Sequence, residues 1–502
     1  MAEYNFLNHP RRSPVHFAIL GTKFMGHHAP RLEDAFQTRR DFLCKCGIGL
    51  GVLSLSALMQ NAYAGESPSA AVDLGTPLAP RAPHFAPKAK RVIHIFAQGG
   101  PSHVDTFDPK PNLTKHDGKV IKDIWKEAPF SGTVFGSPFK FQKHGQSGIE
   151  VSDIFPNVAK HVDEMTVIRS AYTTTPSHEH SMMLINTGSD RLIRPSLGAW
   201  ATYGLGTENQ NLPAFVCMSP GRPLQGEQNW QSAFLPGVFQ GTYVDSNKKQ
   251  VEQLIQYIKS NNTSLAEQRR QLNLLAQLNA EHAAKREKEA QLEARIQSFE
   301  IAYRMQMEAT DAFDISREPA NVRALYGEGT QARQILIARR LVERGVRFVQ
   351  VWQNSWDHHS QIESGMKSSA KEVDQAIGAL LTDLKERGML EDTLVIWGGE
   401  FGRTPTVDAN QNVDQSKGKG RDHHNKAFSI WMAGGGVKKG FVYGESDEWG
   451  YGVVRDKMDV PDFHATVLHL LGFNHEKLTF RYAGRDFRLT DVSGEVAKDI
   501  IA

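Results

Sequence analysis

One stretch decides the fold: T-L-V-I-W-G-G-E-F-G-R-T-P at 393–405, followed after a polar run by G-R-D-H-H at 420–424. Its first five residues are apolar and rich in β-branched side chains, which indicates a buried strand. The two glycines that follow allow a sharp turn. Glu400 should therefore lie at the carboxyl end of the strand, where open α/β sheets place their ligands. Arg403 and the cluster Asp422-His423-His424 come soon after, so this stretch predicts one half of a metal site.

Strand and helix patterns alternate around this stretch. Short apolar runs predict strands at 91–97, 166–170, 346–352 and 428–432, and amphipathic patterns predict helices at 331–344, 371–387 and 462–472. Alternation at this spacing favours a parallel sheet with helices on its faces. We therefore expect an α/β fold with a mostly parallel sheet flanked by helices. A further helix is expected near Pro176, capped by a hydroxyl group just before it.

Composition excludes several classes of function. The 502 residues are 40% apolar and 23% charged, and the net charge is +2, which predicts no strong electrostatic attraction to nucleic acids or membranes. The sequence has no basic patch interleaved with aromatic residues, so nucleic-acid binding is not expected. Three cysteines give no disulfide framework. Of these, Cys217 is expected to be a buried structural thiol.

The first 64 residues have the features of an export signal. A twin-arginine pattern, R-R-D-F-L at 39–43, precedes an apolar run at 47–59 and the cleavage-type sequence A-Y-A at 62–64. The apolar run is shorter than the ~20 residues that span a bilayer, so no membrane span is expected after cleavage. The expected partner is the twin-arginine export machinery, and the expected location is periplasmic or secreted. The alternative is an N-terminal helix that happens to contain two arginines.

The rest of the chain divides by composition. Residues 65–90 are rich in Ala, Pro and Ser and predict a linker or surface arm. Residues 91–492 form the predicted domain, and 493–502 a C-terminal tail. Residues 245–315 are polar and helical, with a break near 261–262, and they interrupt the alternation of strands and helices. We interpret them as an inserted helical hairpin or lid with solvated faces.

Acidic and histidine side chains follow several of the predicted strands. The carboxyl ends of parallel strands share one edge of a sheet, so residues far apart in the sequence can meet there. Carboxylates and imidazoles without thiolates suit Zn, Mn, Mg or Ca, and paired ions would clamp the oxygens of an ester. For any single residue, a polar turn or a helix cap is an equally good explanation. The candidates are Asp105, Asp108, His178, His180, Asp357, His359, Glu400, Asp422, His423 and His424.

Several motifs together resemble a known superfamily. They are G-G-P-S-H-V-D-T-F-D-P-K-P (99–111), W-D-H-H (356–359), E-F-G-R-T-P (400–405), G-R-D-H-H (420–424), H-A-T-V-L-H-L-L-G (464–472) and G-R-D-F-R-L-T-D (484–491). The chain resembles the alkaline phosphatase–sulfatase superfamily, and more narrowly a family of exported, sulfatase-like bacterial proteins of uncharacterised function. The resemblance covers nearly all of the predicted domain except the helical insertion. It implies an alkaline phosphatase-like fold and a metal-dependent hydrolase for phosphate or sulfate esters of a small molecule or a polysaccharide.

The resemblance also implies roles for individual residues. The segment T-T-P-S-H-E-H-S-M-M-L-I-N-T-G (174–188) is similar to the nucleophile segment of the phosphodiesterase branch, which makes Thr174 the nucleophile. Arg403 has no counterpart, but its guanidinium group could hold an ester oxyanion. The implied metal ligands are Asp357 and His359 for one ion, Glu400 for another, and His423 or His424 with Asp422 beside them.

Three departures from the superfamily pattern matter. The position of a metal-binding Asp after the first strand is occupied by Gln98, which leaves Asp105 as a substitute. An Asp-His pair is replaced by Glu400-Phe401, which removes one imidazole. The C/S-x-P-x-R sequence needed for formylglycine is approximated only at 217–222, one residue too long, so a formylglycine sulfatase is not expected. A degenerate member that keeps the fold as a binding or scaffold protein is therefore the alternative to a hydrolase.

Overall fold

A central eight-stranded sheet organises the protein. The computed structural model describes residues 77–254, 263–284, 303–304, 310–409, 416 and 418–502, all within one compact unit that spans 47–502. The strand order is β12-β4-β11-β8-β1-β7-β5-β6. The strands of this sheet are β1 (Arg91–Ala97), β4 (Met165–Ala171), β5 (Phe215–Ser219), β6 (Thr242–Asp245), β7 (Phe348–Gln353), β8 (Thr393–Gly398), β11 (Phe428–Ala433) and β12 (Phe441–Tyr443).

All neighbouring strands are parallel except at one position. The central strand β1 pairs in parallel with β7 and β8, and β5 continues the parallel pattern to β6. Strand β11 runs antiparallel to both of its neighbours, β8 and β4. Strands β4 and β8 therefore point in the same direction. The predicted α/β class with a mostly parallel sheet is confirmed, while the strand at 428–432 is antiparallel.

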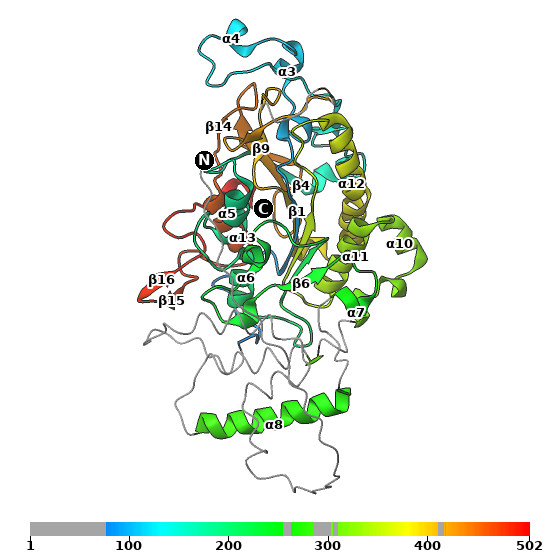
Figure 1. Cartoon of the computed structure of the whole chain (residues 1–502), viewed down its shortest axis with the longest axis vertical. Coiled ribbons are helices and arrows are strands. Elements are labelled where there is room, and N and C mark those ends of the chain that lie inside the picture. The colour runs from blue at the N-terminus through cyan, green and yellow to red at the C-terminus, as the bar shows by residue number, and fades with distance from the viewer. Residues whose placement is uncertain (1–76, 255–262, 285–302, 305–309, 410–415, 417) are drawn as a thin grey trace, which may run out of the picture. The chain divides into compact units, whose positions relative to one another are not determined.

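Helices cover both faces of the sheet. The described helices are α3 (Pro111–Lys115), α4 (Ile121–Ile124), α5 (His178–Thr187), α6 (Leu197–Leu205), α7 (Val251–Leu254), α8 (Leu265–Ala284), α10 (Ala320–Tyr326), α11 (Thr330–Glu343), α12 (Ile362–Glu386) and α13 (Val460–Leu470). Side chains alternate between the faces of a strand, so Ile93 and Ile95 of β1 share a core with α11 and α12. Val92 and Phe96 pack with α5, α6 and α13 on the other face. Figure 1 shows α5, α6 and α13 on one side of the sheet and α11 and α12 on the other.

Short two-stranded ribbons complete the chain. Their strands are β2 (Phe141–His144), β3 (Ile149–Ser152), β9 (Gly402–Arg403), β10 (His423–His424), β13 (Glu445–Ser446), β14 (Val453–Arg455), β15 (Phe480–Tyr482) and β16 (Arg485–Phe487). The ribbon formed by β9 and β10 brings the two parts of the deciding stretch together, since His423 pairs with Arg403.

Two helices begin elsewhere than the sequence predicts. Helix α12 starts at Ile362 instead of 371, although its first residues include Gly and Ser, which are weak helix formers. Ile362 and Met366 lie four residues apart on one buried face, and this burial outweighs the weak local propensity. Helix α5 starts at His178, two residues after Pro176, and the side chain of its N-cap residue, Ser177, makes no capping hydrogen bond.

The first and last described segments of the chain pack against the domain. Residues 77–90 lie in the predicted linker, yet Ala89 is buried and donates a backbone hydrogen bond to Leu470. In the predicted tail, Ile500 is buried and Ile501 forms an antiparallel bridge with Val437. The packed domain therefore extends beyond the boundaries 91–492. The predicted export signal at 1–64 lies outside the described residues. Among the described residues, no helix has the length and apolar character needed to cross a membrane.

The predicted insertion at 245–315 is described only in part. Helices α7 and α8 lie within it, and the break near 261–262 falls outside the described residues. Its last residues belong to the core, because Ala312 and Phe313 pack with α11 and α12. Ion pairs then connect the segment after the predicted insertion to helices α11 and α12. The fully buried Arg339 lies 2.6 Å from Glu318 and 2.9 Å from Asp383.

Candidate metal centre

The strands deliver the site residues to one edge of the sheet. The parallel strands β1, β7 and β8 end at this edge and lead to Gly99, Asp357 and Glu400. Strand β4 points the same way and leads to His178 at the start of α5. The antiparallel strand β11 begins at this edge, so the residue pair just before it brings His423 to the same place. The reversal of β11 thus brings to this edge a histidine that a parallel strand would carry to the opposite edge.

Close backbone packing fixes the segment that carries Asp357 and His359. Gly99 has φ +115°, and a Cβ atom there would lie 2.5 Å from the backbone nitrogen of Asp357. A Cβ atom on Gly420 would lie 2.1 Å from the carbonyl carbon of His359. Only glycine permits such approaches. Ser355, before this segment, adopts a positive φ of 84°, which is uncommon outside glycine and typical of strained functional turns.

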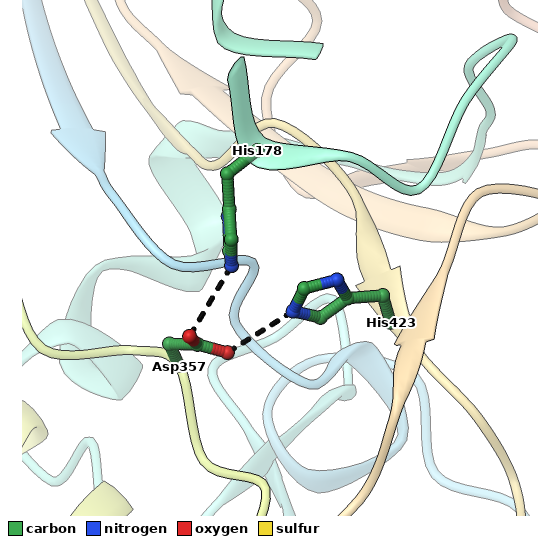
Figure 2. A group of neighbouring side chains, drawn as sticks. All are labelled: His178, Asp357 and His423. Atoms are coloured by element: carbon green, nitrogen blue, oxygen red, sulfur yellow. Dashed lines mark hydrogen bonds and ion pairs between the residues drawn. The ribbon is translucent and has the colours of Figure 1, made fainter. Parts of the chain in front are cut away.

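Three imidazole rings converge on Asp357. Its Oδ1 lies 3.0 Å from Nε2 of His359 and 3.2 Å from Nε2 of His423. Its Oδ2 lies 3.3 Å from Nε2 of His178, and Figure 2 shows two of these rings directed at the carboxylate. The Nε2 atoms of His359 and His423 are 2.9 Å apart. The Asp357 side chain is 44% exposed, so the group opens to solvent on one side.

Two buried carboxylates orient two of these rings. Nδ1 of His178 lies 2.6 Å from Oε1 of Glu400, which is fully buried and also accepts a 3.0 Å hydrogen bond from the backbone of Gly99. Nδ1 of His359 lies 2.6 Å from Oδ2 of Asp408, whose side chain is also fully buried. A carboxylate on Nδ1 fixes the tautomer that leaves Nε2 free as a ligand. Both rings therefore present Nε2 towards Asp357.

Arg403 holds Asp357 and the turn after β1 in place. Its side chain is almost fully buried, and it donates hydrogen bonds to the carbonyl groups of Gly100 at 2.9 Å and Arg421 at 3.1 Å. A further nitrogen contacts both the Gly99 carbonyl and Oδ1 of Asp357. The guanidinium group thus holds the turn after β1 and the central carboxylate in one arrangement. Its predicted role in holding an ester oxyanion stays a prediction.

The charges of the cluster shift its pKa values. Burial raises the pKa of the Asp357 carboxyl, but its contacts with the three imidazole rings and the charge of Arg403 outweigh burial and place the pKa well below its usual range. Burial lowers the pKa of His178, yet its contacts with Asp357 and Glu400 raise it overall to about 9. Burial, with the charge of Arg403, lowers the pKa of His423. The cluster therefore combines an ionised carboxylate, a protonated His178 and a neutral His423 at neutral pH.

The donor atoms fit a divalent metal ion. Two groups have their ligand atoms within 4.8 Å of one another: His178, Asp357 and His423, and His359, Asp422 and His423. Nε2 of His178 is buried without a well-aligned hydrogen bond among the described residues. The Nε2 atoms of His359 and His423 are too close for both to carry a proton, so at least one presents a lone pair. Because His423 is common to both groups, the donors suit one shared ion better than two.

Several predicted site residues lie apart from this cluster. Asp105 is buried in an ion pair with Arg421, at 2.7 Å, and does not reach Asp357. His424 points away from the cluster, and its Nε2 contacts the carbonyl group of Tyr451. Burial lowers the pKa of His424 to about 4. Thr174 lies in an exposed bend between β4 and α5. The structure therefore brings together Asp357, His359 and His423, with Asp422 at the rim and Glu400 and Arg403 behind them.

The remaining candidates have separate local partners. Asp108 lies 2.9 Å from Lys110 and contacts Ser446, while the exposed His180 lies 3.1 Å from the hydroxyl group of Ser177. His178 is a sequence candidate without an assigned role, and the structure places it in the cluster. Asp408 is missed by the sequence analysis. It lies in a polar loop with no motif, so no local signal distinguishes it.

Fold and site together define a class: an α/β protein with a histidine–carboxylate centre at the carboxyl edge of a mostly parallel sheet. The chain belongs to the family described as "Protein of unknown function (DUF1501)", whose model matches residues 89–501. This match includes all but the last residue of the predicted tail. No curated protein sequence matches the chain.

Solved structures show weak overall similarity to this chain. Alkaline phosphatase from the Antarctic bacterium TAB5 is 11% identical with a TM-score of 0.31, and the match covers 71% of this chain and 94% of that one. The PsFucS1 sulfatase from Pseudoalteromonas sp. is 14% identical with a TM-score of 0.33, covering 78% and 68%. The lipoteichoic acid synthase LtaP from Listeria monocytogenes is 10% identical with a TM-score of 0.32, covering 83% and 79%. Because these scores are below 0.5, we base the proposed function on the geometry of the site.

Proposed function

We propose that the protein is an exported hydrolase of phosphate or sulfate esters that uses a divalent metal ion. One observation carries the proposal: three imidazole Nε2 atoms converge on Asp357, and buried carboxylates orient two of the rings. The donors would be His178, His359, His423 and Asp357. Three imidazoles with one carboxylate suit zinc better than Mg or Ca, which take oxygen ligands. Manganese remains compatible with the mixed donors.

The residues of the chain prepare this site for the ion. Glu400 and Asp408 hold the tautomers of His178 and His359, and Arg403 keeps Asp357 ionised and in place. When bound, a divalent ion at these donors would act as a Lewis acid on an ester oxygen. Because His178 carries a proton in the metal-free cluster, binding of the ion should release a proton to solvent.

A specific observation favours the alternative, a degenerate binding or scaffold protein. Asp357 is already neutralised by the guanidinium group of Arg403. Phe401, which stands in place of a superfamily imidazole, is fully buried, with its ring 4.8 Å from that of His178 and 4.7 Å from that of His423. The cluster can therefore be stable without catalysis.

Metal analysis with an ester panel separates the two functions. The purified full chain should contain close to one divalent ion and should hydrolyse aryl phosphates or aryl sulfates. Asp357→Ala should lose the ion and the turnover together, while the fold survives because the cluster lies at the sheet edge. His144→Ala, a histidine of β2 outside the cluster, is the matched control and should keep both. A stably folded protein that neither binds an ion nor hydrolyses any ester would favour the scaffold function.

The nucleophile is tested separately. Thr174→Ala should abolish turnover while the metal stays bound, because a nucleophile contributes to the chemistry and not to metal affinity. Normal turnover in this variant would move the role to Ser177 or to water. The hydroxyl group of Ser177 is spared from helix capping and donates a 3.0 Å hydrogen bond to Glu179.

Export is the last part of the proposal. The R-R-D-F-L and A-Y-A patterns support cleavage near Gly65 and a periplasmic or secreted mature protein. Replacing Arg39 and Arg40 together with lysine should retain the protein in the cytoplasm. N-terminal sequencing of exported material should begin near Gly65, and a sequence that starts before Arg39 would contradict the proposed signal.

A further inference from the structure

A lobe of the chain exposes apolar side chains beyond the edge of the sheet that carries the metal centre. It comprises residues 111–134 with the helices α3 and α4, and Figure 1 shows both helices beyond β9, away from the rest of the sheet. Its exposed apolar residues are Val120, exposed to 44%, and Ile124 and Trp125, each exposed to 37%. All three lie within α4 or directly beside it. A group of large apolar side chains that the fold leaves exposed together marks an interaction surface.

Stacked aromatic rings hold the lobe in one position. The ring of Trp125 stacks on that of Trp449, with 6.2 Å between the ring centroids and 20° between the planes. Phe130 stacks on Tyr451 at 4.6 Å, and Tyr451 packs in turn on the ring of His424 at 4.7 Å. Trp449 is buried, so Trp125 covers it and keeps the exposed part of its own ring on the outside. The exposed side chains are therefore held in place before any partner binds, which lowers the entropy cost of binding.

The lobe is joined to the ribbon that carries the proposed ligand His423. Val134, at the end of the lobe, forms an antiparallel bridge with Thr406, which follows β9 closely. The ring of Tyr451 packs on that of His424, the neighbour of His423 in β10. A surface that holds the exposed part of the lobe would therefore also fix the position of the metal centre relative to that surface.

Charges of both signs surround the exposed apolar residues. The lobe carries four lysines and three acidic residues, all of them exposed: Lys115, Asp117, Lys119, Lys122, Asp123, Lys126 and Glu127. The two signs almost balance, so the lobe has no strong preference for an anionic surface. Zwitterionic lipid headgroups present phosphate and ammonium groups side by side, and these can pair with lysines and carboxylates respectively. The charges of the lobe therefore complement a zwitterionic headgroup layer.

Tryptophan and lysine together suit the boundary between water and lipid. Tryptophan rings concentrate at the headgroup level of bilayers, and lysine stems can lie along apolar surface while their ammonium groups stay in water. We propose that the lobe docks the protein onto a zwitterionic lipid surface, with Ile124 and Trp125 inserted among the headgroups. This contact is peripheral and needs no helix that crosses the membrane. A second copy of the chain fits less well, because a stable protein interface takes about 20–30 residues on each side, whereas the exposed apolar residues lie within 120–125.

The test measures binding to neutral vesicles. The full chain is sedimented with phosphatidylcholine vesicles, and hydrogen exchange of the lobe is followed by mass spectrometry with and without them. The wild-type protein should bind, and the backbone amides of 117–130 should exchange more slowly on the vesicles. Hydrogen exchange reports on the lobe itself, so binding through the apolar run at 47–59 cannot imitate this result. Vesicles that also contain phosphatidylglycerol should bind about equally well, because the charges of the lobe almost balance.

Variants of the exposed residues make the test specific. Ile124→Ser should weaken vesicle binding about three- to fivefold, because roughly a third of the side chain is free to insert. Ile124→Ser combined with Trp125→Ser should weaken it on the order of 50-fold. Leu325→Ser, a leucine of α10 outside the lobe that is 40% exposed, is the matched control and should bind like the wild-type protein. Thermal melting checks each variant, and Ile124→Ser decides the matter if the loss of Trp125 from Trp449 unfolds the lobe.

Three results would overturn the docking surface. The first is equal vesicle binding by Ile124→Ser and the wild-type protein, or hydrogen exchange in the lobe that vesicles leave unchanged. The second is a dimer that forms without vesicles and is lost in Ile124→Ser, since the occupant would then be a second copy of the chain. The third is binding only to vesicles with phosphatidylglycerol that disappears at high salt, which would indicate an electrostatic contact with anionic lipid. None of these measurements depends on ester hydrolysis, so docking and the proposed function can fail separately.

Discussion

Glu400 offers the sharpest test of how the metal centre is built. The sequence predicts it as a metal ligand, whereas its carboxylate is fully buried behind His178 and accepts one hydrogen bond from Nδ1 of the ring and one from the backbone N–H of Gly99. Glu400→Gln keeps the size of the side chain and changes only its donors and acceptors. If its amide NH2 faces His178, the ring must accept at Nδ1 and carry its proton on Nε2, towards the metal. If its oxygen faces His178, the NH2 opposes the N–H of Gly99.

Either orientation of the glutamine amide removes one buried hydrogen bond or forces His178 into the tautomer whose Nε2 carries a proton and cannot bind the ion. Leaving a buried polar group unsatisfied costs about 1–3 kcal/mol, which corresponds to roughly 10–100-fold in an equilibrium constant. Changes to groups that orient metal ligands typically cost the same factor in metal affinity. We therefore expect Glu400→Gln to weaken zinc binding by about 10–100-fold while the protein stays folded.

Zinc affinity is measured by competition with a chromogenic chelator at constant pH. Glu179→Gln, an exposed carboxylate next to His178 in sequence, is the matched control and should bind zinc like the wild-type protein. The fall in zinc affinity in Asp357→Asn gives the size of the effect expected when a direct ligand is removed. A loss in Glu400→Gln as large as that in Asp357→Asn would show that Glu400 ligates the ion itself. Unchanged affinity would show that His178 is not a ligand, and the reasoning would fail.

Three other changes test the packing around the site and the core. Gly420→Ala would place a methyl group 2.1 Å from the His359 carbonyl carbon, where real contacts stay beyond 3.0 Å. The segment must then move by about 1 Å, so zinc affinity in the same chelator assay should fall by ~10–100-fold, whereas Gly452→Ala, which has space, should not alter it. Arg339→Met removes one arginine partner from each of the buried carboxylates Glu318 and Asp383, which keep Arg340 and Arg387, and should cost about 1–3 kcal/mol in urea unfolding; an unchanged free energy of unfolding would contradict the network. Burial lowers the pKa of His464 from 6.5 to about 4, so its contribution to stability is present above pH 6.5 and is lost as the pH falls towards 4, up to about 3 kcal/mol. In His464→Gln that loss should disappear, and identical pH profiles of unfolding in the two proteins would refute the assignment.

Local sequence patterns predicted most of the sheet because hydrophobic runs have to be buried wherever the chain places them. The runs at 91–97 and 393–397 became β1 and β8 within one residue of the predicted limits. The start of α12 was missed because its first turns contain Gly and Ser and are helical through burial of Ile362 and Met366. The direction of β11 was missed as well. A hydrophobic pattern predicts a strand, but it does not show which strands lie beside it or whether they run parallel or antiparallel.

The candidate site divides in the same way. The sequence by itself determined which residue types follow each strand, and so it placed Asp357, His359 and His423 at one edge of an α/β sheet. Only the tertiary structure decided which side chains face the centre. The pleat of β10 turns His423 towards Asp357 and His424 away from it, because neighbouring residues of a strand point to opposite faces.

The division between ligands and supporting residues also came from the fold alone. Asp105 meets Arg421, and Asp408 meets His359, only when loops more than 40 residues apart in sequence pack together. The sequence does not show which residue a carboxylate will contact, because that depends on distances set by strand order and loop packing. The sequence therefore determined the composition of the centre, and the tertiary structure determined its geometry, because a hydrogen bond requires atoms about 3 Å apart.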